Sequence, residues 1–225
     1  MKSILFDTLK TLFIYTILCV STFLISTTIV EYSSFRDNVA FLQYKQDYLH
    51  ITHWKIAFYI HVFSSIFCLI AGFTQFSKQI QTSYPSIHRF IGKVYVFNIL
   101  VINFPVALIM AYYANGMLPT KIAFTILDCL WFWFTLKSFI EVKRKNFKQH
   151  ENFMIRSYAL TFSAITLRTW KMILSNTTDI DPESLYMINA WLGFVPNWLL
   201  AEYYIWMKNK NLLYSTKTFT NTYPK

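Results

Sequence analysis

Residues 56–76 read IAFYIHVFSSIFCLIAGFTQF, an apolar run without Asp, Glu, Lys or Arg and with a single histidine, His61. A helix needs roughly 20 apolar residues to cross the hydrocarbon core of a bilayer, so this run is long enough to span it. Apolar and polar residues do not alternate along it with a period of two, as they would in the strands of a membrane barrel. The run therefore predicts a transmembrane helix, in which the backbone hydrogen bonds close within the segment.

The rest of the chain has the same apolar character. Of its 225 residues, 55% are hydrophobic and only 14% are charged, which is too little polar surface to cover a water-soluble domain. The sequence predicts an all-α, polytopic membrane protein, a six-transmembrane-helix bundle. We expect one domain over residues 1–210 and a polar tail over 211–225, with helices near 11–30, 56–76, 94–113, 122–140, 152–174 and 185–207.

The basic residues predict how this bundle is oriented. Outside the expected helices, most Lys and Arg residues fall on the side that also holds both termini. Because basic loops stay in the cytoplasm, we expect cytoplasmic N- and C-termini and a place in the bacterial cytoplasmic (inner) membrane. The first helix has no signal-peptide cleavage pattern and is expected to be retained. The net charge of +10 follows from this asymmetry, so the expected partner is the lipid bilayer and not nucleic acid.

Three ionisable residues are expected inside the membrane at a similar depth, namely His61, Asp128 and Arg168. Charge is costly in hydrocarbon, so these positions are the first candidates for a functional site. If their helices are neighbours, Asp128 and Arg168 would form an ion pair beside a titrating His61, as in a proton relay or an anion site. The alternative is an ion pair that only fixes helix packing. The loop over residues 31–55 is long enough to cap this end of the bundle.

A second group of candidates lies at the predicted cytoplasmic ends of the helices. Depth matching pairs Arg156 with Glu202 in a second ion pair, although side chains at this interface also extend to lipid headgroups without any function. Pro105 and Pro196 are expected to kink their helices near the middle of the membrane. The candidates of the second group are His88, Arg89, His150, Arg156, Tyr158 and Glu202.

Two histidines of the second group are candidate haem ligands. His88 and His150 each precede a helix that runs outward, and each is followed by a basic residue and a tyrosine at similar spacing. Paired imidazoles on separate helices can supply both axial ligands of a b-type haem. The sequence has no nucleotide-binding loop, zinc motif or nucleophile triad, and it assigns no enzyme class.

Three segments resemble a known family. The segments HRFIGKVY (88–95), HENFMIRSYALTF (150–162) and TLR (166–168) are similar to the bacterial multi-pass membrane proteins of the domain of unknown function 2306 (DUF2306) family. The resemblance covers roughly residues 56–205 and implies a multi-helix membrane fold without implying an activity. It also implies a candidate site at His61, His88, Arg89, His150, Arg156, Tyr158 and Arg168.

These features favour a membrane redox protein that binds b-type haem or a quinone. The aromatic residues, 22 Phe, 15 Tyr and 7 Trp, could line such a pocket or form belts at the membrane surface. The first alternative is a proton-coupled carrier of a small solute, with His61, Asp128 and Arg168 as the relay. The second is a non-catalytic assembly or scaffold protein, in which ion pairs only hold the bundle together.

Overall fold

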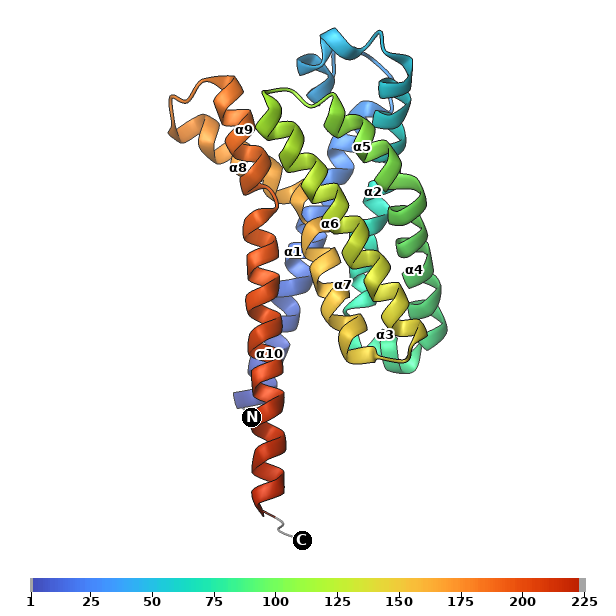
Figure 1. Ribbon diagram of the computed structural model, residues 1–225, viewed down its shortest axis with the longest axis vertical. Coiled ribbons are helices and arrows are strands. Elements are labelled where there is room, and N and C mark those ends of the chain that lie inside the picture. Colours follow the sequence, from blue (N-terminus) through green and yellow to red (C-terminus); the bar gives the residue numbers. More distant parts are fainter. Residues whose placement is uncertain (1, 223–225) are drawn as a thin grey trace.

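The computed structural model describes residues 2–222, and most of these residues are helical (Figure 1). No β-strand occurs in this range, which confirms the all-α prediction. In chain order the elements are α1 (Lys2–Tyr32), η1 (Ala40–Tyr44), η2 (Gln46–Tyr48), α2 (Thr52–Gln75), α3 (Lys78–Ser83), α4 (Pro85–Phe97), η3 (Asn98–Asn103), α5 (Phe104–Tyr112), α6 (Leu118–Lys143), α7 (Phe147–Thr161), α8 (Ser163–Thr177), α9 (Pro182–Leu192) and α10 (Val195–Thr222).

The first four predicted spans correspond to apolar helices of the required length. In the described part of the chain, 4 helices are long and apolar enough to cross a membrane. Their outer surfaces carry large exposed apolar side chains, such as Phe23 and Phe67, as contact with lipid requires. The four candidate spans are Tyr15–Tyr32, Thr52–Gln75, Pro85–Tyr112 and Leu118–Lys143.

The segments predicted as the fifth and sixth spans are each divided into two helices. The segment 152–174 breaks at Phe162, between α7 and α8, and the segment 185–207 breaks after Leu192, between α9 and α10. Pro196 helps to explain the second break, because it has no backbone N–H to donate to the carbonyl of Leu192, the last residue of α9. The prediction of one continuous helix over each of these two segments was therefore wrong. The count of six spans stays a prediction.

Hydrogen bonds join the two breaks to each other. The Thr166 hydroxyl donates to the carbonyl of Gly193, and the Asn197 amide donates to the Thr166 hydroxyl over 3.0 Å. These bonds satisfy a carbonyl that the break would otherwise leave without a partner. Beyond the breaks, α8 and α9 pack against each other at an angle to α7 and α10 (Figure 1).

A π-helical segment, η3, precedes Pro105 in the third predicted span. Asn103 is fully buried there, and its amide donates to Asn98 Oδ1 over 2.8 Å and to the Ser64 hydroxyl over 3.0 Å. Proline provides no N–H for the preceding turn, and a widened helix is one way in which the backbone adapts to this loss. The irregularity expected near Pro105 is therefore present, and a buried amide cluster accompanies it.

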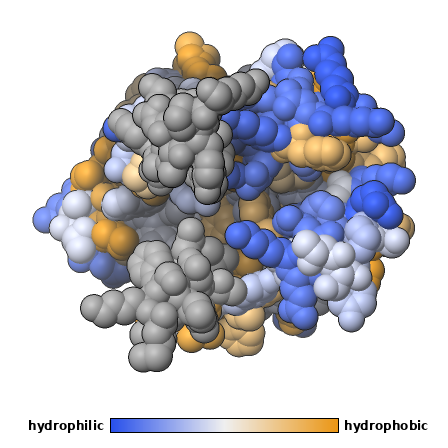
Figure 2. All heavy atoms as spheres, turned by 90° about the horizontal axis from the view of Figure 1, so that it is seen from below, coloured by the Kyte–Doolittle hydropathy of each residue, from blue (hydrophilic) through white to orange (hydrophobic). Residues whose placement is uncertain are grey.

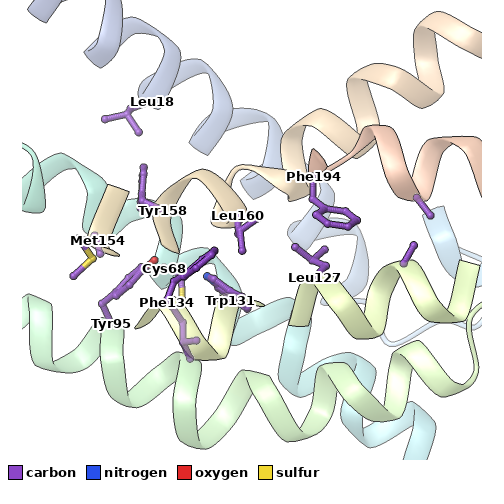
Figure 3. Close-up of a cluster of buried hydrophobic side chains, with 14 residues drawn as sticks. Leu18, Cys68, Tyr95, Leu127, Trp131, Phe134, Met154, Tyr158, Leu160 and Phe194 are labelled. Carbon is purple, nitrogen blue, oxygen red and sulfur yellow. The ribbon is translucent and has the colours of Figure 1, made fainter. Parts of the chain in front are cut away.

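Figure 3 shows the cluster of buried hydrophobic side chains in the core, and a hydrogen-bonded polar network accompanies this cluster between α4, α6 and α7. The Tyr95 hydroxyl lies 2.8 Å from that of Ser157 and 3.0 Å from that of Thr161, which also accepts a bond from the Trp131 indole over 3.0 Å. Buried polar groups need such partners where water is excluded. The network therefore fixes how these helices are rotated against one another.

Both described chain ends lie at the end of the bundle opposite residues 33–51 (Figure 1). The exposed residues Arg144 and Lys145 belong to this end, and Figure 2 shows hydrophilic side chains gathered over part of it. Which side of a membrane it faces stays a prediction. The predicted polar tail, 211–225, continues α10 as far as Thr222, and its last residues lie outside the described range.

Candidate functional site: a cavity beneath the cap

A cavity of about 1200 Å³ lies beneath the segment 33–51, which we call the cap. The cavity is bounded by α1, α2, α5, α6, α7, α8 and α9, and its lining is mostly apolar. Leu127, Trp131 and Leu160 line it and also belong to the core cluster in Figure 3. Binding sites for small molecules are typically concave and apolar with a few convergent polar groups, and this cavity has that composition.

All three residues predicted at a common membrane depth line this one cavity. His61 comes from α2, Asp128 from α6 and Arg168 from α8. Depth along a helix does not state which way a side chain points, so their shared orientation toward one space is a finding of the structure. The cavity is thus the place where these three side chains can act on the same bound molecule.

His61 has an incompletely satisfied imidazole. Its Nδ1 is buried and has no hydrogen-bond partner among the described residues. The Asn103 amide lies beside the ring, and the charge of Arg168 acts on it from across the cavity. A neutral imidazole offers one donor and one acceptor nitrogen, so His61 can exchange hydrogen bonds with a ligand in this position.

Asp128 is 8% exposed and forms no hydrogen bond or ion pair with any described residue. The ion pair expected between Asp128 and Arg168 is therefore not formed, although both side chains line the same space. Depth matching places the two residues at one level in the membrane, but it does not show whether their side chains meet. Here both side chains line the cavity without touching each other. An unpaired carboxyl inside the bundle is costly when it is charged, which makes Asp128 a candidate proton-binding group.

The α8 wall presents two exposed cations, Arg168 and Lys171, to the cavity. Arg168 donates from Nη1 to the carbonyl of Ala164 over 2.5 Å, and its other N–H groups have no acceptor among the described residues. Lys171 lies 4.3 Å from the centre of the Tyr44 ring in the cap. The wall therefore carries positive charge with unused donors.

A third cation, Lys45, was not among the predicted site residues. Its side chain reaches from the cap to the turn between α5 and α6, where Nζ donates to the carbonyl of Tyr113 over 2.5 Å and to Asn115 Oδ1 over 2.6 Å. The Tyr48 ring centre lies 4.6 Å from Nζ. Lys45 is only 2% exposed. Lys45 therefore holds the cap over the cavity. The length of the loop over residues 31–55 had predicted such a cap at this end of the bundle.

Burial also changes the acidity of this lysine. Loss of hydration, with a smaller contribution from the charge of Lys121, lowers the pKa of Lys45 from 10.5 to about 8. The folded protein therefore binds this proton less tightly than an unfolded chain does. Stability is reduced below about pH 8 and recovers as the pH rises toward 10.5, because the cost of burying the charge disappears.

We expect this linkage to be measurable with the Lys45→Met variant, which lacks the titrating group. The melting temperature of the wild type, minus that of Lys45→Met, should increase between about pH 8 and about pH 10. Taking the difference cancels the titration of all other groups. A difference that stays constant or decreases over this range would contradict a lowered pKa for Lys45.

The second group of predicted residues contains the expected ion pair at its centre. Arg156 Nε lies 2.5 Å from Glu202 Oε1 and Nη2 lies 2.7 Å from Oε2, a two-bond arrangement that links α7 to α10. The Trp198 indole donates to the same carboxylate over 3.1 Å. Depth matching was therefore correct for Arg156 and Glu202, and the pair holds two helices together.

Removing one member of this pair should cost stability, and removing both should restore much of it. The Glu202 side chain is 38% exposed, so solvent screening limits the loss in Glu202→Met to about 1 kcal/mol. The double variant Arg156→Met and Glu202→Met leaves no charge without its partner. Melting temperatures of the wild type, both single variants and the double variant measure this coupling. Additive losses would show that the pair does not couple the helices.

The remaining members of the second group lie outside the cavity. His150 Nδ1 lies 2.9 Å from the Ser138 hydroxyl, and His88 and His150 are near enough for their charges to interact. Tyr158 donates to the carbonyl of Leu69 over 2.6 Å, while Arg89 is exposed. None of these residues lines the cavity, and no group of three or more potential metal ligands occurs in the described part of the chain. Haem ligation by His88 and His150 therefore stays a prediction.

The fold and the cavity define a helical membrane protein with an interior polar site. A family model described as "Predicted membrane protein (DUF2306)" matches residues 58–205, a range that includes His61, Asp128 and Arg168. The chain belongs to this family, as the motifs around His88 and His150 predicted. No curated protein and no solved structure matches the chain.

Proposed function

We propose that this protein is a proton-coupled carrier of a small solute that binds in the cavity beneath the cap. The proposal rests on the convergence of His61, Asp128 and Arg168 on one cavity. A coupled carrier needs a solute site and a proton site that affect each other. Asp128 is suited to the second role, because an unpaired intramembrane carboxyl can take up or release a proton as its surroundings change.

The broken helices support the same proposal. Interrupted helices near the middle of the membrane are a common way to build a transport site. Here the α8 and α9 pair, which carries Arg168, is joined to α7 and α10 through two short breaks. We infer that this pair moves as a unit when the cavity opens, in a cytoplasmic membrane with both chain ends inside and the cap outside.

The experiment that tests this proposal records proton entry into reconstituted vesicles. The purified protein is inserted into vesicles that contain a pH-sensitive dye, and membrane-impermeant acids, bases and neutral solutes are added outside. We expect at least one class of solute to acidify the lumen of protein-containing vesicles and not of empty ones. No response to any class, from protein that is helical by circular dichroism, would contradict the carrier.

A membrane redox protein is the second candidate, in the form of a quinone-binding protein. Trp54, Phe58 and Trp131 line the cavity together with His61, which could donate a hydrogen bond to a quinone carbonyl. An absorbance spectrum of the purified protein before and after dithionite tests the haem prediction at His88 and His150. Analysis of a solvent extract for quinone tests the other form. If the protein has neither ligand nor transport, the assembly or scaffold role becomes the leading explanation.

A further inference from the structure

The charges of the cavity are unbalanced. Lys45, Arg168 and Lys171 line it, and none of them forms an ion pair in the described part of the chain. Two carboxylates, Asp128 and Glu183, also line the cavity, and neither is within ion-pair distance of a cation. With three cations and two carboxylates, the lining carries a net positive charge, and no cation has an anion in contact with it.

The cation with unused donors is the one best placed to hold a ligand. The Arg168 guanidinium donates one N–H to the carbonyl of Ala164 in its own helix. Its planar, fork-shaped array of donors matches the oxygens of a carboxylate or phosphate group. Lys171 follows one turn later on the same wall and adds a second charge. Lys45 already donates to Tyr113 and Asn115, which leaves one of its three N–H groups, so it contributes mainly charge.

The lining next to these cations is apolar. Ile66, Leu69 and Leu127 line the same cavity, which at about 1200 Å³ is far larger than a phosphate or carboxylate group needs. We propose that the ligand of the cavity is an anionic amphiphile, whose phosphate or carboxylate group binds Arg168 and Lys171 and whose apolar tail occupies the space next to Leu127. This inference rests on the proposed function for its biological role, but not for its test.

Binding can be measured without transport, so the two proposals can fail separately. Three probes divide the ligand into its parts: octyl phosphate, inorganic phosphate without a tail, and octanol without a charge. Each is titrated into the protein in discs of zwitterionic lipid while tryptophan emission is recorded, because Trp54 and Trp131 line the cavity. Protein in discs that binds octyl phosphate but moves no protons in vesicles would support this inference and contradict the carrier.

The variants locate the anionic group. We expect Arg168→Gln to weaken octyl phosphate binding at least about tenfold, the loss of roughly 1.4 kcal/mol that removal of a charged hydrogen bond brings. Lys171→Gln should weaken it severalfold. Lys143→Gln is the matched control, because Lys143 is an exposed lysine that also lies over an aromatic ring, that of Phe139, and does not line the cavity. Its affinity should equal that of the wild type.

Three results would overturn the inference. Octanol that binds as tightly as octyl phosphate would show that the charge is not recognised. Inorganic phosphate that binds as tightly as octyl phosphate would show that the tail is not recognised, and a free anion would then be the ligand. Equal losses in Arg168→Gln and in the Lys143→Gln control would show that Arg168 does not hold the anion.

Discussion

Replacing Asp128 with Asn is expected to abolish solute-driven proton entry into reconstituted vesicles while the protein remains folded. The Asp128 carboxyl is buried in the cavity wall without a hydrogen bond or a cation of its own. The amide has nearly the same size and shape but cannot exchange a proton at neutral pH. Because a buried charge is removed and no partner is left unpaired, stability should be unchanged or slightly higher.

A control variant shows whether the effect of Asp128→Asn is specific to this carboxylate or follows from the loss of any carboxylate. Asp179 is exposed in the loop between α8 and α9, so Asp179→Asn should transport as the wild type does. Solute should still bind to Asp128→Asn, as seen in tryptophan emission, since only the proton step is lost. Full proton entry in Asp128→Asn would remove this residue from the mechanism.

The Gly72→Ala substitution is expected to lower stability by about 3 kcal/mol, through overpacking and loss of a buried hydrogen bond. A methyl group at this position in α2 would overlap the hydroxyl and the ring of Tyr158. That ring cannot move freely, because its hydroxyl donates to the carbonyl of Leu69 over 2.6 Å and the ring packs against Phe76. Thermal unfolding in detergent, followed by circular dichroism, measures the loss.

Gly92 in α4 provides the comparison. A methyl group there would meet only the Gln75 side-chain amide, at 3.1 Å, and this amide, which donates to the His88 carbonyl, would have to move by only a few tenths of an ångström. Because alanine favours a helix over glycine by about 1 kcal/mol, Gly92→Ala should be neutral or stabilising. If Gly72→Ala and Gly92→Ala have equal stability, α2 and α7 do not pack as closely as described.

The sequence predicted the first four spans because each is a continuous apolar helix, for which composition is enough. It did not predict the broken helices. Pro196 was recognised as a kink, but the break also depends on the bond between Thr166 and Gly193, two residues 27 positions apart. A hydropathy pattern contains no information about such a tertiary bond, so two apolar segments read as two continuous helices.

The sequence predicted the residues of the candidate site better than the contacts between them. The cost of charge in hydrocarbon singled out His61, Asp128 and Arg168 without any knowledge of their partners. Whether Asp128 and Arg168 touch depends on how α6 and α8 are separated, which depth does not show. Lys45 was missed because it lies in a loop and because its hydrogen-bond acceptors, near residue 113, are distant in sequence. The aromatic residues around it, at Phe41, Tyr44 and Tyr48, were the available signal.

An infrared titration of the Asp128 carboxyl, with and without a bound ligand, tests whether proton binding and solute binding are coupled in the cavity. Difference spectra between the wild type and Asp128→Asn isolate the band of this one protonated carboxyl. We predict that the band is present, titrates, and changes its midpoint when octyl phosphate or another solute that drives proton entry is added. A band that is absent, or that titrates identically with and without the ligand, would contradict a cavity in which solute and proton binding are coupled.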